Sequence, residues 1–167
     1  AMLSRFAFED RNGVAGRVMT RLGNVYLETR LDLPNSSPLF WVLQYPLATL
    51  RNLAHIKADR FTACLEEIDG AVSDLGKAEI QRPDSELIQR EIRLSARMMR
   101  HACLRGRLLV EGESAPDGVL IRNLKADVEE WLEEYRQIWL ERNRPGGLKD
   151  SVAGIERLVK EYNQLQK

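Results

Sequence analysis

The chain of 167 residues is 44% hydrophobic and 30% charged, a composition typical of a folded domain and not of a disordered segment. Lysine and arginine together number 25, and aspartate and glutamate also number 25, so no overall field attracts nucleic acid or an acidic membrane. Two cysteines are too few for a disulfide framework or a zinc site, and we expect both Cys64 and Cys103 to be small core residues.

The first residues lack a basic region followed by a long apolar run, and no apolar run approaches the ~20 residues that span a bilayer. These features argue against a signal peptide and a membrane span, and they favour a cytoplasmic protein. Ala1 before Met2 resembles the residue left after a tag is removed. We therefore expect residues 1–12 to be this remnant and a connection from an upstream domain, with an apolar strand or loop over Phe6–Gly13.

Residues 13–167 are predicted to form a single helical domain, because apolar residues recur at spacings of three and four. The first helix is expected over residues 14–28. The second begins at Pro38, with Ser37 as its N-cap, and ends near residue 45. Further helices are predicted over residues 50–80, 85–110, 120–142 and 148–165. Long helices joined by short polar turns favour an all-α fold, an antiparallel bundle of about five to six helices.

A row of arginines lies along the helix predicted over residues 85–110 and could bind phosphates. Its members are Arg90, Arg93, Arg97, Arg100 and Arg107. The helix predicted over residues 120–142 carries a matching acidic row, Glu129, Glu130, Glu133, Glu134 and Glu141. Antiparallel packing of the two helices would let the rows pair. We therefore favour a paired or solvated face over a nucleic-acid site.

Two groups of aromatic residues are candidate interface residues. Trp131, Tyr135 and Trp139 recur at helical spacing, which indicates core packing or a domain interface more often than a sugar contact. Phe40 and Trp41 belong to a short, very apolar helix, which indicates burial or contact with another domain.

No convergent catalytic or metal-binding set is found. His55 and Asp59 are four residues apart but supply only two ligands, and the Glu-x-x-His pairs of di-iron bundles are absent. Adjacent glutamates such as Glu66-Glu67 point about 100° apart on a helix, so they do not face each other across a substrate. The sequence therefore predicts no catalytic residue, no metal ligand and no cofactor.

The last two predicted helices meet at a corner made of Asn143, Pro145, Gly146 and Gly147. Asn143 or Gly146 is expected to end the first helix in a left-handed conformation, and Pro145 prevents the helix from continuing. Gly147 then caps the final helix. The two helices should turn sharply and pack as a hairpin.

The segment around this corner resembles the helical region that follows the barrel in bacterial β-N-acetylhexosaminidases of glycoside hydrolase family 20. The residues that carry the resemblance are Tyr135-Arg136, Trp139-Leu140, Arg142–Leu148 and Asp150-Ser151. Shorter matches are Gly23–Tyr26, Pro34-Asn35 and Leu39-Phe40.

Members of that family cleave terminal N-acetylhexosamine with retention, using the substrate's acetamido oxygen as nucleophile and an adjacent Asp-Glu pair in a (β/α)8 barrel. This chain contains no Asp-Glu dipeptide and is shorter than the ~250 residues of such a barrel. The resemblance therefore implies a noncatalytic C-terminal accessory domain. Its partners would be the catalytic barrel upstream in the same polypeptide and a second copy in a homodimer. The alternative is a free-standing interaction or regulatory bundle, including one that binds nucleic acid through the Arg90–Arg107 face.

Overall fold

The computed structural model describes residues 2–31, 33, 36–50, 53, 55–111 and 118–166, and these residues form seven α-helices and no strand. The predicted all-α fold is therefore confirmed. The helices are α1 (Met2–Ala7), α2 (Val14–Asn24), α3 (Pro38–Gln44), α4 (Ala58–Leu75), α5 (Ser85–Glu111), α6 (Val119–Arg142) and α7 (Leu148–Leu165). Two 3-10 helices are η1 (Val25–Thr29) and η2 (Leu47–Thr49). Pro34 and Asn35, which contribute to the resemblance, lie outside the described residues.

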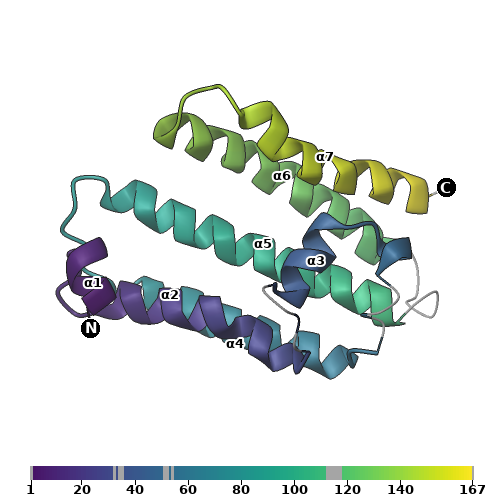
Figure 1. The fold of residues 1–167 in the computed structure, drawn as a ribbon, viewed down its shortest axis with the longest axis horizontal. Helices are drawn as coiled ribbons and strands as arrows, with labels where there is room; N and C mark the ends of the chain where they lie inside the picture. The colour runs from purple at the N-terminus through teal and green to yellow at the C-terminus, as the bar shows by residue number, and fades with distance from the viewer. Residues whose placement is uncertain are drawn as a thin grey trace.

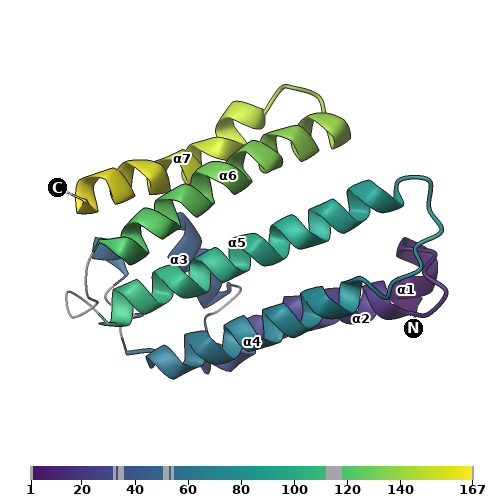
Figure 2. The ribbon, with the colours of Figure 1, turned by 180° about the vertical axis from the view of Figure 1, so that it is seen from behind.

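The helices form two layers. α4, α5 and α6 lie side by side with alternating directions, as an antiparallel bundle requires (Figure 1). On one face of this layer, α2 packs on α4, α3 packs on α5 and α7 packs on α6, an arrangement that Figure 2 shows from behind. Because α3 is short, it covers only the C-terminal part of α5, and the N-terminal part of α5 stays open on this face (Figure 1).

Two predicted helices differ from the structure at their ends. The helix expected over residues 14–28 changes at Asn24 from α-helix to η1, and the helix expected over residues 50–80 begins only at Ala58. Leu50, Leu53 and Ile56 are buried, but they lie in consecutive tight turns in which Leu53 N–H donates to Leu50 C=O and Ile56 N–H donates to Leu53 C=O. Their spacing of three therefore reflects repeated turns and not an α-helix.

The N-terminal segment also differs from the prediction. The strand or loop expected over Phe6–Gly13 is a turn at residues 8–13, but Phe6 and Ala7 belong to α1 (Met2–Ala7). The buried Ser4 hydroxyl accepts the Gly16 N–H at 3.0 Å, and the buried Asp10 carboxylate accepts the N–H groups of Ala15 at 2.7 Å and Glu79 at 2.8 Å. These bonds fasten residues 4–10 to the start of α2 and to the segment before α5.

One hydrophobic core joins all the longer helices. In its centre the fully buried Phe61 ring of α4 lies against Gly106 of α5, where a Cβ atom would come within 2.4 Å of the ring. The absence of a side chain at residue 106 therefore lets α4 and α5 approach each other. Cys64 and Cys103 are both buried free thiols, as the sequence predicted.

We expect Gly106→Ala to lower the free energy of unfolding by about 1–3 kcal/mol, because the added methyl group overpacks a buried aromatic ring. Gly23→Ala in α2 is the matched control, since a Cβ atom there meets no heavy atom within 4 Å. The control should be neutral or stabilising by up to about 1 kcal/mol through helix propensity. Denaturant unfolding followed by circular dichroism measures both. Equal stability of the two variants would contradict this packing.

Candidate functional site

A buried polar cluster lies where α5 meets α6, α7 and the end of α3. Its members are His101, Arg105, Asp127, Glu161 and Tyr162. His101 and Arg105 are one helical turn apart on α5, and both side chains are fully buried. α6 supplies Asp127, and α7 supplies Glu161 and Tyr162. Buried polar groups are tolerated only when they are hydrogen-bonded, so the partners of each member decide what the cluster can do.

His101 is held at both ring nitrogens. Its Nδ1 lies 2.8 Å from Asp127 Oδ2, and its Nε2 lies 2.8 Å from the Tyr162 hydroxyl. With Nδ1–H donating to the carboxylate, Nε2 accepts from the Tyr162 O–H, so a neutral imidazole satisfies both contacts. Burial lowers the pKa of His101 despite the neighbouring carboxylate. The ring is therefore neutral near pH 7.

Arg105 joins three parts of the fold. Its guanidinium pairs with Glu161 of α7 and donates to the backbone carbonyls of Val42 and Tyr45 at the end of α3. The other Glu161 oxygen accepts the Leu47 N–H at 2.8 Å. A buried charge is costly unless it is paired, and here Glu161 and two helix-end carbonyls compensate it.

The cluster contains the donor types of an acid–base site, but its geometry is that of a structural network. Tyr162 occupies the nitrogen of His101 that a reacting group would need, and both side chains are fully buried. Burial also raises the pKa of Tyr162, which keeps the phenol protonated. Asp127 has a lowered pKa, because hydrogen bonds from His101 and Arg97 outweigh the effect of its burial. His101 and Tyr162, which are fully buried, therefore cannot exchange a proton with a bound substrate without opening the bundle.

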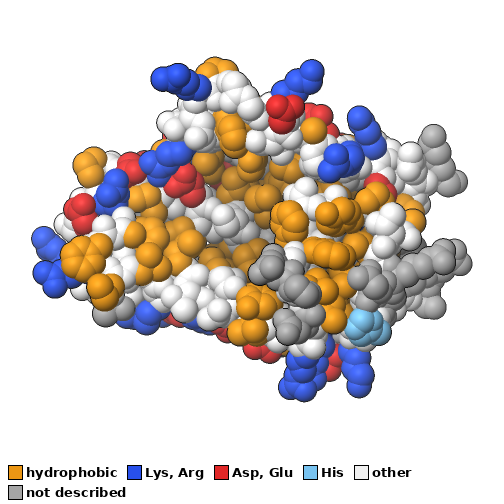
Figure 3. All heavy atoms as spheres, in the orientation of Figure 1, with side chains coloured by type: hydrophobic (Ala, Val, Ile, Leu, Met, Phe, Trp, Pro, Cys, Tyr) orange, Lys and Arg blue, Asp and Glu red, His pale blue; other side chains and the backbone are white. Residues whose placement is uncertain are grey.

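Two adjoining hollows form a surface trough along the open part of α5. One hollow, of about 410 Å³, lies between α1, α2 and the start of α5, and the other, of about 350 Å³, lies between α2, α3 and the later part of α5. Ser95 lines both. The apolar walls include Met19, Met98 and Phe40, and Figure 3 shows hydrophobic side chains gathered over the middle of this face.

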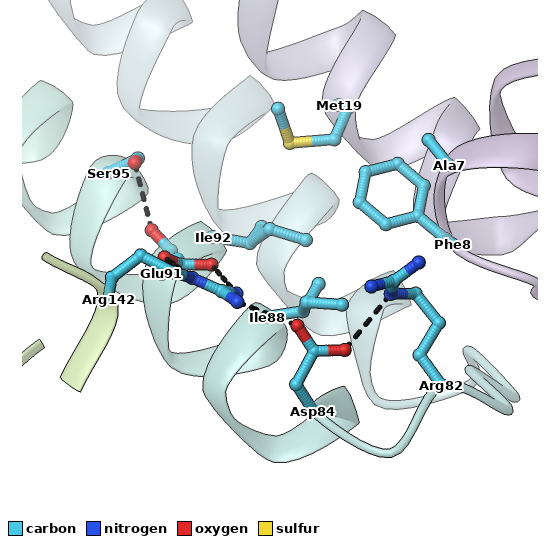
Figure 4. Close-up of a pocket in the computed structure, with 10 residues that line it drawn as sticks. All are labelled: Ala7, Phe8, Met19, Arg82, Asp84, Ile88, Glu91, Ile92, Ser95 and Arg142. Atoms are coloured by element: carbon cyan, nitrogen blue, oxygen red, sulfur yellow. Dashed lines mark hydrogen bonds and ion pairs between the residues drawn. The ribbon is translucent and has the colours of Figure 1, made fainter.

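Ion pairs close one side of the first hollow (Figure 4). Arg142, the last residue of α6, contacts both Glu91 carboxylate oxygens at 2.8 and 2.7 Å and donates to Asp84 at 2.7 Å. Arg82 donates to the other Asp84 oxygen at 3.0 Å. Arg142 lowers the pKa of Asp84. This chain of charges ties the corner end of the α6–α7 hairpin to the start of α5.

The predicted aromatic interface residues have different roles. Trp131 is fully buried and is a core residue. Tyr135 and Trp139 are half-buried and stacked, with ring centroids 6.1 Å apart. Trp41 is half-buried, and its indole N–H donates to the Ser36 hydroxyl, whereas Phe40 is 53% exposed and lines the trough.

The corner between α6 and α7 forms, although not with the predicted conformation. Asn143 is extended, and Gly146 does not adopt a positive φ, so the expected left-handed end of α6 is wrong. Gly147 is the N-cap of α7, as predicted, and has φ +89°. The Trp139 indole N–H donates to the Arg144 carbonyl at 3.1 Å and braces the turn that contains Pro145.

The arginine row of α5 is paired with carboxylates, as the sequence analysis favoured. Arg90 and Arg97 pair with carboxylates of α6. Arg90 contacts Glu141 at 2.7 Å, and Arg97 contacts Asp127 at 2.8 Å and Glu130 at 2.7 Å. Arg100 pairs with Asp69 of α4, and Arg107 pairs with Glu111 within α5. Arg93 donates to Gln89. Most of the positive charge of this face is thereby compensated within the protein.

Other candidate chemistry is not assembled. The part of the chain that the structure describes contains no group of three or more metal-ligating side chains, and His55 is exposed. The neighbouring Cys64 thiol and burial raise the pKa of Cys103, so it is a poor nucleophile. Glu67 pairs with Arg21 of α2 at 2.7 Å, and Asp74 pairs with the same guanidinium at 2.7 Å, so arginine neutralises both carboxylates.

Sequence reasoning missed the buried polar cluster. Its one signal was that His101 and Arg105 lie four residues apart and therefore share one side of α5. The partners Asp127, Glu161 and Tyr162 belong to helices more than 20 residues away, and no local spacing marks them.

We expect stability to fall as the pH drops below about 6.5, because the unfolded chain then protonates His101 while the folded chain resists it. His101→Gln should flatten this dependence between about pH 7.5 and pH 5, and His55→Gln, at the exposed histidine, should retain it. Carboxylates with lowered pKa values lose their contribution only at lower pH. Urea unfolding at several pH values in this range gives the slope of the free energy of unfolding against pH. An unchanged slope in His101→Gln would refute the assignment.

Comparisons of the chain with protein-family models, curated proteins and solved structures found no match. Within the described residues, no helix is long and apolar enough to cross a membrane. The function therefore has to be inferred from the chain's own residues and geometry.

Proposed function

We propose that this chain is a noncatalytic helical accessory domain of a glycoside hydrolase family 20 β-N-acetylhexosaminidase, supporting the catalytic barrel, dimerisation or both. The observation that carries the proposal is the resemblance of the segment Arg142–Leu148, with Trp139 before it and Asp150-Ser151 after it, to the helical region that follows the barrel in that family.

The positions of these residues are consistent with a segment kept for structural reasons. Arg142 ties α6 to Asp84 and Glu91 near the start of α5, and Trp139 braces the corner. Asp150 lies in the first turn of α7, where a negative charge favours the helix. The segment therefore fixes a helical hairpin on α5 and needs no catalytic role to account for it.

A noncatalytic role also agrees with the acidic residues. A retaining or substrate-assisted glycosidase needs a protonated carboxyl group at a substrate site, which burial or a like charge provides. The carboxylates that line the first hollow, Asp84 and Glu91, pair with Arg142, which favours the ionised form.

The face of α3 is the best candidate for contact with a partner domain. Phe40 and Tyr45 are large, exposed apolar residues at its two ends, and the open trough adjoins Phe40. Trp131 and Trp139 are less suited to this role than the sequence suggested, because the structure uses them in the core and in the corner.

A free-standing interaction bundle is the second candidate, and the open apolar trough is the observation that favours it. A nucleic-acid-binding version of this candidate is weaker, because Arg90, Arg97 and Arg100 are paired with carboxylates.

The isolated chain is expected to show no hydrolysis of 4-nitrophenyl N-acetyl-β-D-glucosaminide above the buffer rate, since the described residues form no accessible acid–base pair. A commercial hexosaminidase provides the positive control. Saturable hydrolysis of this substrate that copurifies with the folded chain would contradict the noncatalytic role.

In the full-length enzyme that the proposal requires, Phe40→Asp should weaken the association between barrel and bundle, because a charge cannot be buried unpaired at an interface. Leu165→Asp, at an exposed leucine at the end of α7, is the matched control. Limited proteolysis of the interdomain connection and thermal unfolding report the association. Identical behaviour of both variants and the parent would exclude α3 as the contact.

A further inference from the structure

We propose that the hollow between α1 and the start of α2 is a binding site for a phosphate-type dianion, either inorganic phosphate or a phosphate monoester. The hollow has a volume of about 540 Å³. The elements that border it, α1 and the start of α2, lie at one end of the bundle (Figure 1). This inference is independent of the proposed hexosaminidase function.

Three arginines line the hollow: Arg5 of α1, Arg11 of the turn and Arg17 of α2. The ion pairs that the described residues make include none from these three side chains. The Arg17 Nη1 atom donates to the Asn12 carbonyl at 3.2 Å, and the Arg5 guanidinium lies 5.4 Å from the centroid of the Phe6 ring. All three guanidiniums are exposed and keep free N–H groups.

Several arginines elsewhere in the described residues are neutralised by carboxylates. Arginines of the larger surface rows, such as Arg90, Arg97 and Arg142, each contact a carboxylate. Like charges placed together without a counter-charge repel one another, and an anion bound between them would remove that repulsion. Arginine is also the side chain best suited to bind phosphate oxygens in pairs.

The two acidic residues of the hollow do not neutralise it. Asp10 is buried, and each of its carboxylate oxygens already accepts a backbone N–H, from Ala15 and from Glu79. Glu9 is exposed, and its nearest cation is Arg82 at 3.9 Å, at the far end of an ion-pair chain. The lining thus holds three arginines and two carboxylates, so the hollow keeps a surplus of one positive charge.

The start of α2 adds little binding capacity of its own. The Ala15 N–H is bound by Asp10 and the Gly16 N–H by Ser4, so these N–H groups are not available to a ligand. The arginines carry the site, and the partial positive charge of the helix terminus only reinforces them.

The test is isothermal titration of the protein with inorganic phosphate and, in a second arm, with a simple sugar phosphate at constant ionic strength. The proposal predicts saturable binding of at least one ligand. The double variant Arg11→Gln/Arg17→Gln should weaken it about tenfold or more, because two charge-assisted contacts are lost. Tighter binding of the sugar phosphate would identify a monoester as the ligand, and equal affinities would identify the phosphate group alone.

The matched control is Arg93→Gln/Arg157→Gln, which removes the same charge from exposed arginines on α5 and α7. It should bind phosphate as the parent does. Thermal melts without phosphate check that both double variants fold. Absence of saturable binding to the parent, or equal loss in both double variants, would overturn the proposal, because binding would then be absent or follow net charge alone.

Discussion

The burial of Arg105 is the constraint on which much of the fold depends. A guanidinium cannot lose its proton at ordinary pH, so a fully buried arginine must be compensated by its surroundings. Here the compensation comes from Glu161 of α7 and from the carbonyls of Val42 and Tyr45. Removing one partner of a buried pair typically costs about 3–5 kcal/mol, because a lone charge remains. The charge therefore selects one arrangement of α3, α5 and α7, including the position of α3 along α5.

That position of α3 has a consequence for the surface. α3 ends over the later part of α5, where Arg105 holds its last carbonyls, and it does not extend over the first part of α5. The apolar residues on this side of the first part of α5 are then not covered by α3, and the trough remains. The same buried charge that closes one half of the bundle thus leaves the other half open to a partner.

The parts of the fold that the sequence predicted well are those in which local pattern and packing agree. The spacing of apolar residues predicted α5, α6 and α7 to within one residue at each end, and it placed Trp131 in a helix that packs inward. The glycines and proline between Arg142 and Leu148 predicted the corner. The predicted left-handed conformation of Asn143 was wrong. The chain leaves α6 in an extended form, and a hydrogen bond from the Trp139 indole to the Arg144 carbonyl braces the turn.

The parts that sequence reasoning could not reach depend on contacts between distant segments. α1 becomes a helix because Ser4 is fastened to Gly16 of α2, and α4 begins late because Leu50 and Leu53 are buried in turns. His101 acquires its partners only when the register of α6 and α7 against α5 is fixed. Arg5, Arg11 and Arg17 likewise line one hollow only when the turn between α1 and α2 has formed. No local spacing of residues in the sequence predicts these contacts between distant segments.

The central claim, that the bundle is an accessory domain of a larger hydrolase, is tested most directly by sequencing the source gene upstream of the codon for Leu3. The account predicts an open reading frame that runs back into a region encoding a (β/α)8 barrel, with adjacent aspartate and glutamate codons after one of its strands. An in-frame stop codon close upstream of a start codon at Met2 would contradict the claim and leave a free-standing interaction bundle.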